Sequence, residues 1–226
     1  MARLFKVGHN AEPEIVKFFK ETGWTIYDVD PARKDKPLPQ WKATDFDGHM
    51  TMYLDSIGSH PTITGGKNVL LEYKTYNTKR FSALVNKPGG IPVNDDKYYA
   101  QVCIYLKHFD LPYCVFYAVN KNDSDVYIEI IERNDKEADH YLRRAEDIIN
   151  SQSRPKKISN TATYWECKMC EFAGICHGSD MPDFNCRSCV NASPAPDGNW
   201  HCRVWGKEIP GEKEILEGCA SYERIT

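Results

Sequence analysis

The sequence lacks a long apolar run. None of its 226 residues belongs to a segment near the ~20 consecutive apolar residues that a membrane-spanning helix requires, and mean hydropathy is -0.58. Residues 1–6 also lack the apolar stretch of a secretory signal. We therefore predict a cytoplasmic protein with no membrane partner.

A strong charge of one sign is also missing. The 29 Lys and Arg residues nearly balance 32 Asp and Glu residues, for a formal net charge of -3. This excludes a generic basic coat for nucleic acid and argues against a membrane-surface binder, but an enzyme with positive charge confined to one groove stays open. Neither a G-x-G-x-x-G nor a Walker motif occurs, which disfavours dinucleotide and P-loop chemistry.

What the sequence does contain is clustered cysteine. Seven of its nine cysteines fall between residues 167 and 219. In a chain without a secretory leader, clustered cysteines favour metal binding over disulfides. The last four provide a complete tetrahedral set for one structural Zn²⁺ and are Cys186, Cys189, Cys202 and Cys219. They predict a zinc-ribbon-like module over residues 183–226.

The first three clustered cysteines form a second set without a clear fourth ligand. They are Cys167, Cys170 and Cys176. Candidates for the fourth place are His177, His201, His9 or a cysteine of the main domain, although His177 directly follows Cys176, which is an awkward geometry. A second structural zinc, a 4Fe–4S cluster and simple reduced thiols all stay open, because thiolates bind both metals. We predict that residues 159–182 form a metal-binding segment packed on the main domain.

Hydrophobic periodicity predicts one main domain over residues 1–158. The expected helices are 10–23, capped by Asn10, then 95–110 and 135–151. The expected strands are 49–57, 69–76, 113–120 and 126–132, with loops at 31–42, 58–67, 86–95 and 152–163. The order predicts an α/β domain with a small mixed central sheet flanked by helices.

One strand of that sheet carries an unusual pair of charges. Glu72 and Lys74 are two residues apart, so they share one face of the strand while Leu71 and Tyr73 face the other way. Asp55, at the end of the preceding strand, would lie level with Glu72 in an antiparallel pair. Two carboxylates and the backbone carbonyl of Tyr73 suit Mg²⁺ or Mn²⁺. Beside them, Lys74 would orient an attacking water and stabilise a phosphate.

The arrangement of Asp55, Glu72 and Lys74 resembles the motif of the PD-(D/E)XK nuclease superfamily. Residues 8–13 resemble the first-helix motif of its RecB, Cas4 and lambda-exonuclease-like branch, and residues 99–105 resemble the Q-x-x-x-Y helix motif of RecB-type nucleases. The cysteine run from residue 167 to 176 is similar to that of the iron–sulfur members. Those members also have an early cysteine, which this chain lacks before Cys103, and this favours zinc.

The resemblance implies a restriction-endonuclease-like core with a C-terminal cysteine-rich metal-binding extension. It further implies that Glu12 or His9 completes the metal shell, and that Gln101 and Tyr105 hold a phosphate or a carboxylate. The expected protein is a phage- or prophage-type DNA nuclease, in particular an exonuclease, that hydrolyses phosphodiester bonds with a metal-activated water. It would serve DNA recombination or replication in the cytoplasm of a bacterial host, beside a single-strand annealing or replication protein.

Three basic residues after the catalytic strand are candidates for DNA binding: Lys79, Arg80 and Lys97. They could follow the phosphate backbone, or belong to an ordinary solvated loop. A different class of function also stays open, namely a non-catalytic nucleic-acid-binding or adaptor protein built on a nuclease-like fold.

Overall fold

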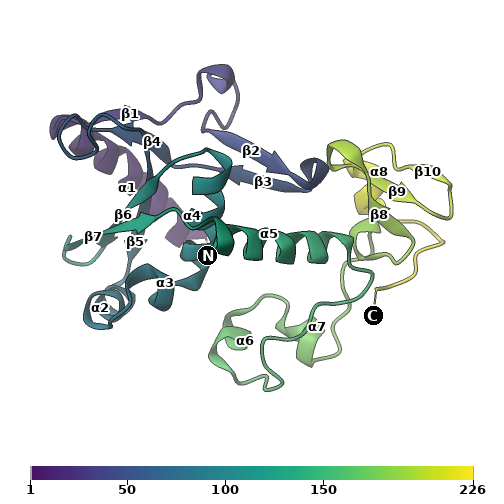
Figure 1. Cartoon of the computed structure of the whole chain (residues 1–226). Coiled ribbons are helices and arrows are strands. Elements are labelled where there is room, and N and C mark those ends of the chain that lie inside the picture. Colours follow the sequence, from purple (N-terminus) through teal and green to yellow (C-terminus); the bar gives the residue numbers. More distant parts are fainter. Residues whose placement is uncertain (1, 226) are drawn as a thin grey trace. The chain divides into compact units, whose positions relative to one another are not determined.

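A computed structural model of the chain describes the backbone of residues 2–225 and the side chains of residues 11–225 (Figure 1). The helices are α1 Ala2–Glu21, α2 Thr78–Asn86, α3 Gly90–Asn94, α4 Asp96–His108, α5 Asp135–Asn150, α6 Trp165–Met169, α7 Ala173–His177 and α8 Glu212–Glu217. The strands are β1 Thr25–Tyr27, β2 Lys42–Asp45, β3 Met50–Tyr53, β4 Ser56–Ser59, β5 Val69–Tyr76, β6 Tyr113–Asn120, β7 Val126–Glu132, β8 Ala192–Pro194, β9 Trp200–Cys202 and β10 Lys207–Glu208.

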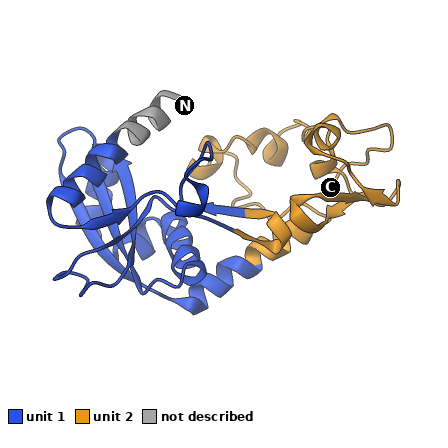
Figure 2. Cartoon of the chain, turned by 90° about the horizontal axis from the view of Figure 1, so that it is seen from above, with its two compact units in different colours: residues 1–43, 51–143 blue, residues 44–50, 144–226 orange. Residues whose placement is uncertain are grey.

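The chain divides into two compact units (Figure 2). Unit 1 contains Met1–Ala43 and Thr51–Arg143, and unit 2 contains Thr44–Met50 and Arg144–Thr226. The predicted domain boundaries near residues 158 and 182 stay predictions. Among the helices described, none is both long and apolar enough to cross a membrane.

Unit 1 is built on a five-stranded sheet with the order β1-β4-β5-β6-β7. β5 pairs with β6 in parallel, and every other neighbouring pair is antiparallel. The parallel pair requires a long crossover, which α2, α3 and α4 provide between β5 and β6. The predicted α/β class, with a mixed central sheet flanked by helices, is therefore confirmed.

The central strand β5 is buried on both faces, as expected for a strand that helices cover on each side. Its residues Val69, Leu71 and Tyr73 belong to a buried apolar cluster with Ile15, Val16 and Phe19 of α1. The alternate residues face the other way, toward α4, where Glu72 meets Gln101. The predicted division of β5 into an apolar face and a charged face is confirmed.

Several predicted element bounds are wrong. The expected strand 49–57 is broken into β3 and β4 at Leu54, whose N–H donates to the carbonyl oxygen of Trp41. The first helix begins at Ala2 rather than at an Asn10 cap, so Pro13 lies inside it. The sequence reading also missed β1, β2, α2 and α3, which lie in short segments or in segments rich in Gly and Pro.

Unit 2 contains a small antiparallel sheet with the order β10-β9-β8. Two Asp-Gly turns of this unit pack against each other, because a Cβ on Gly48 would lie 2.8 Å from the backbone nitrogen of Gly198. Beside them, His49 Nε2 lies 2.9 Å from the carbonyl oxygen of Ala195, and its ring meets Trp200 edge-on. Only glycine fits this contact at Gly48, which also has a φ of 90°.

Truncation of one buried side chain of β5 should show how much the core of unit 1 depends on this strand. Leu71 is fully buried, so Leu71→Ala should lower the free energy of unfolding by about 2–5 kcal/mol. Ile128→Ala is the matched control, because Ile128 is 57% exposed on the edge strand β7, and it should cost less than ~1 kcal/mol. Urea denaturation followed by circular dichroism measures both; equal losses would contradict the assignment of the core.

Candidate active site

The pairing of β4 with β5 determines where the predicted acidic residues meet. Ser56 pairs with Leu71 in antiparallel register, so Asp55 stands level with Glu72 at the first residue before β4. The prediction that these two carboxylates would be level is confirmed, although Asp55 precedes a strand instead of ending one. The break between β3 and β4 is what leaves Asp55 outside the hydrogen-bonded ladder.

Asp55 is held by two groups of β5. Its Oδ2 accepts a hydrogen bond from the backbone N–H of Tyr73 at 3.0 Å and lies 3.3 Å from Lys74 Nζ. Tyr73 thus contacts the site through its N–H, and the predicted role of its carbonyl oxygen as a metal ligand stays a prediction. The Tyr73 hydroxyl, 2.7 Å from Ser56 Oγ, fixes the same strand pair from the apolar face.

Glu72 is the most deeply buried charged residue of the site, with 0% of its side chain exposed. Its Oε1 forms an ion pair with Lys74 Nζ and accepts a hydrogen bond of 2.9 Å from Gln101 Nε2. Gln101 lies 3.1 Å from the Tyr105 hydroxyl, so the Q-x-x-x-Y pair of α4 reaches the site as predicted. Glu72 Oε2 has no hydrogen-bond partner among the described residues.

The electrostatics of the site follow from this burial. Burial raises the pKa of Glu72 to about 7, against the opposing effect of Lys74 and with a further increase from Asp55 and Glu12. Burial by itself lowers the pKa of Lys74, but Glu72 and Asp55 outweigh it and hold this pKa well above its ordinary value. The two carboxylates therefore favour the protonated, cationic form of Lys74.

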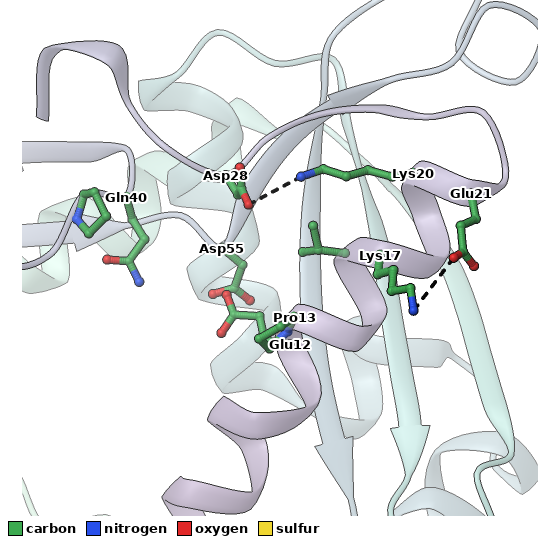
Figure 3. A pocket seen from close by; sticks show the side chains of 10 residues that line it. Glu12, Pro13, Lys17, Lys20, Glu21, Asp28, Gln40 and Asp55 are labelled. Carbon is green, nitrogen blue, oxygen red and sulfur yellow. Dashed lines mark ion pairs between the residues drawn. The ribbon is translucent and has the colours of Figure 1, made fainter. Parts of the chain in front are cut away.

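The first helix contributes a third carboxylate. Glu12 and Asp55 line the same cavity, and their carboxylates point toward each other in Figure 3. Glu12 also lies close enough to raise the pKa of Glu72. The other residue predicted on this helix, His9, lies outside the described side chains.

Sequence reasoning missed the contact that Tyr98 makes with the site. Lys74 Nζ lies 5.0 Å from the centre of the Tyr98 ring, a cation–π distance. The ring of Tyr98 also contacts Tyr76 and Phe116, so it is fixed in place. Its spacing of three residues before Gln101 puts both on one face of α4, and this signal could have identified it.

The residues predicted to bind DNA lie on the helices α2 and α4. Lys79 is exposed on α2, and Lys97 is exposed in the first turn of α4. Arg80 forms an ion pair of 2.6 Å with Asp95 and lies over the Tyr76 ring. The structure therefore gives Arg80 a partner within the fold, and the DNA-binding role of all three stays a prediction.

In unit 2, three cysteines lie near Cys186. Burial raises the pKa of the Cys186 thiol, and the neighbouring thiols of Cys189, Cys219 and Cys202 raise it further. The backbone N–H of Glu223 lies 3.5 Å from Cys189 Sγ. However, no group of three or more His, Cys, Asp or Glu side chains within the described part of the chain has a geometry ready for a metal ion. The four thiols are near one another without a closed coordination shell.

The other three cysteines lie on two short helical turns. Cys167 is buried in α6, Cys170 is exposed just after it, and Cys176 is half-buried in α7 beside His177. The Cys170 N–H donates to the Cys167 carbonyl oxygen at 3.1 Å. No disulfide joins any of the nine cysteines, all of which are described, and the metal at this second set stays a prediction.

No protein-family model and no curated protein matches this chain. It is similar to a solved structure described as "Crystal structure of SSO0001", with 18% sequence identity and a TM-score of 0.40. The similarity covers 75% of this chain and 68% of the other. A likeness of this size establishes no family.

The buried ion pair can be tested without assuming an activity. Lys74→Met leaves the Glu72 carboxylate buried without its cation, so it should destabilise the fold by roughly 3–5 kcal/mol. Glu72→Gln/Lys74→Met should cost less than the sum of the two single changes, since neither charge is then left unpaired. Urea denaturation with EDTA present measures the cycle, and Lys79→Met is the exposed control. Additive losses would contradict a direct coupling.

Proposed function

We propose that the protein is a metal-dependent deoxyribonuclease with a restriction-endonuclease-like core, and that it acts as an exonuclease. The observation that carries this proposal is the convergence of Asp55, Glu72 and Lys74 from two neighbouring strands. Asp55 Oδ2 lies 3.3 Å from Lys74 Nζ, which forms an ion pair with Glu72. Carboxylates beside a fixed ammonium suit a reaction that handles a phosphate.

The chemistry of these oxygen donors suits a hard divalent cation, although among the described residues they do not form a ready coordination group. Glu72 Oε2 is a buried carboxylate oxygen without a hydrogen-bond partner among the described residues, which is costly unless a ligand uses it. Asp55 and Glu12 add oxygen donors at the edge of the cavity, and Mg²⁺ and Mn²⁺ prefer such oxygens. A cation held there would lower the pKa of a coordinated water and neutralise charge on the phosphate.

Each protein group then has a separate task. Lys74, in its cationic form, stabilises negative charge on the phosphate and orients the attacking water. Gln101 holds Glu72 Oε1 at 2.9 Å and so fixes the direction of Oε2. The Tyr73 N–H does the same for Asp55. Tyr98, under the ammonium, limits the positions that Lys74 can take.

Cleavage assays on DNA test this proposal. Asp55→Asn, Glu72→Gln and Lys74→Ala should each reduce Mg²⁺-dependent release of nucleotides from end-labelled linear DNA by ~100-fold or more, because each removes charge from the reacting centre. Lys136→Ala, at an exposed position of α5, should change the rate by less than about fivefold. Circular DNA should resist an exonuclease.

The alternative function is a non-catalytic adaptor for nucleic acid or protein on the same fold. It predicts DNA binding without nucleotide release. Cleavage retained in all three site variants would contradict our assignment of the catalytic residues, whereas absence of cleavage by the wild-type protein would favour the adaptor.

We further propose that Cys186, Cys189, Cys202 and Cys219 hold one structural Zn²⁺. The thiols surround Cys186, and the N–H of Glu223 beside Cys189 Sγ suits a thiolate ligand. Cys202 also belongs to the small apolar cluster of Ile209 and Ile215, against which Trp200 packs. A core this small needs a metal to be stable.

Metal analysis tests whether the four cysteines of the zinc-ribbon-like module bind zinc. We expect the purified protein to contain zinc, and Cys202→Ser to lose about one equivalent, because the tetrahedral set is then incomplete. Cys103→Ala, a buried cysteine of unit 1, should keep all its zinc. Elemental analysis measures both. A brown protein that contains iron would instead favour the 4Fe–4S alternative at Cys167, Cys170 and Cys176, and zinc unchanged in Cys202→Ser would exclude the proposed ligand set.

A further inference from the structure

A cavity of about 780 Å³ extends from Asp55 along one side of α1. Figure 3 shows Glu12 and Asp55 close together in it, with Lys17 and Lys20 further along the helix. All of its lining residues belong to unit 1. The volume is that of a site for one or two small-molecule units, and a DNA duplex is too wide to enter.

The two lysines of the cavity are held loosely. Lys20 Nζ lies 3.8 Å from Asp28, and Lys17 Nζ lies 3.9 Å from Glu21. In both pairs the side chains are about half exposed or more, so each pair contributes little to stability. A phosphate that enters the cavity can therefore replace either carboxylate at small cost.

The rest of the lining suits a nucleoside. Pro13, Val16 and Pro39 supply apolar surface, on which a base or sugar can pack. Gln40, which also lines the cavity, has a buried Oε1 without a hydrogen-bond partner among the described residues. An amide that lacks a partner can bond the polar edge of a base.

The charges of the cavity set a condition on binding. Its lining includes four carboxylates, those of Glu12, Glu21, Asp28 and Asp55, against the two ammonium groups of Lys17 and Lys20. A polyanion is repelled by that excess of negative charge. One divalent cation at the Asp55 end would cancel it.

We propose that this cavity is a subsite for an unpaired nucleotide next to the scissile phosphate, and that it accepts the strand only with a divalent cation present. Lys17 and Lys20 contact the phosphate of that nucleotide, and Pro13, Val16 and Gln40 contact its base and sugar. The inference rests on the proposed nuclease function, since it places the bound strand beside Asp55. It identifies the substrate as a single strand or a frayed end.

Binding of a fluorescein-labelled phosphorothioate oligothymidylate, followed by anisotropy, tests the subsite without requiring cleavage. We expect affinity in Mg²⁺ to exceed affinity in EDTA by tenfold or more, and a blunt hairpin duplex to bind more weakly. Lys17→Ala/Lys20→Ala should weaken binding by about tenfold. It should also reduce the slope of log affinity against log salt by ~0.7, since both lysines contact one phosphate and each neutralised phosphate on a single strand accounts for that amount.

Asp28→Asn should change the affinity in the opposite direction to the double lysine variant. It frees Lys20 from its carboxylate partner and removes one of the four carboxylates of the cavity, so binding should tighten by roughly two- to threefold. Lys67→Ala is the matched control, because Lys67 is exposed in the turn between β4 and β5 and should leave affinity within twofold.

The outcomes of these binding experiments test the proposed subsite separately from the proposed nuclease activity. Unchanged affinity in the double lysine variant, or weaker binding in Asp28→Asn, would overturn the subsite even if wild-type protein cleaves DNA. Equal binding in EDTA would overturn the cation requirement, and equal binding of the blunt duplex would overturn the single-strand assignment. Lysine-dependent binding without any cleavage would retain the subsite and reject the nuclease.

Discussion

The buried ion pair of Glu72 and Lys74 is the constraint on which the rest of unit 1 depends. A carboxylate with 0% exposure cannot keep its charge unless neighbouring groups compensate for the lost water. The surroundings supply them: the ammonium of Lys74, the amide of Gln101 from α4, and the ring of Tyr98 below the ammonium. Such a pair seldom stabilises a protein more than apolar residues of the same size would. Its position in the middle of a core strand therefore favours a chemical role for the pair, and the proposed nuclease reaction supplies such a role.

The topology of the sheet explains how Asp55 and Glu12 come to lie near that pair. β5 is covered on both sides of the sheet, so its charged face is closed by α4 while its apolar face packs on α1. A cavity reaches the site at Asp55, directly before the neighbouring strand β4. The break between β3 and β4 puts Asp55 at that point, with the Tyr73 N–H to hold it. The same helix that covers the apolar face brings Glu12 to the cavity beside Asp55. Backbone geometry thus gathers acids that the sequence separates by 60 positions between Glu12 and Glu72.

The sequence could predict the parts of this site that depend only on the residue repeat of strands and helices. Glu72 and Lys74 share a face because strands have a period of two, and Gln101 and Tyr105 share one because helices repeat near four. It could not predict the interruption at Leu54, where the backbone N–H donates to the carbonyl oxygen of Trp41, 13 residues earlier, because periodicity carries no sign of such a contact. Helix α3 was missed because the Pro and Gly residues around 88–92 were interpreted as a loop, and α2 was missed because no element was assigned to its nine residues. The cavity lysines gave no signal, because two cations on an exposed helix face are ordinary until the fold places them beside Asp55.

A chain with a formal charge of -3 is an unusual candidate for a protein that handles a polyanion, and the distribution of its charge bears on this difficulty. The cations of the site and of its cavity are paired with acids: Lys74 with Glu72, Lys20 with Asp28 and Lys17 with Glu21. Each acid lowers the attraction for a phosphate while the site is without its metal. Under the proposed function, a divalent cation reverses the balance, because two positive charges on oxygen ligands outweigh the excess of carboxylates. Affinity for the strand and competence for hydrolysis then depend on the same ion. A protein of this kind needs no basic surface, and it would bind nucleic acid weakly wherever the ion is absent.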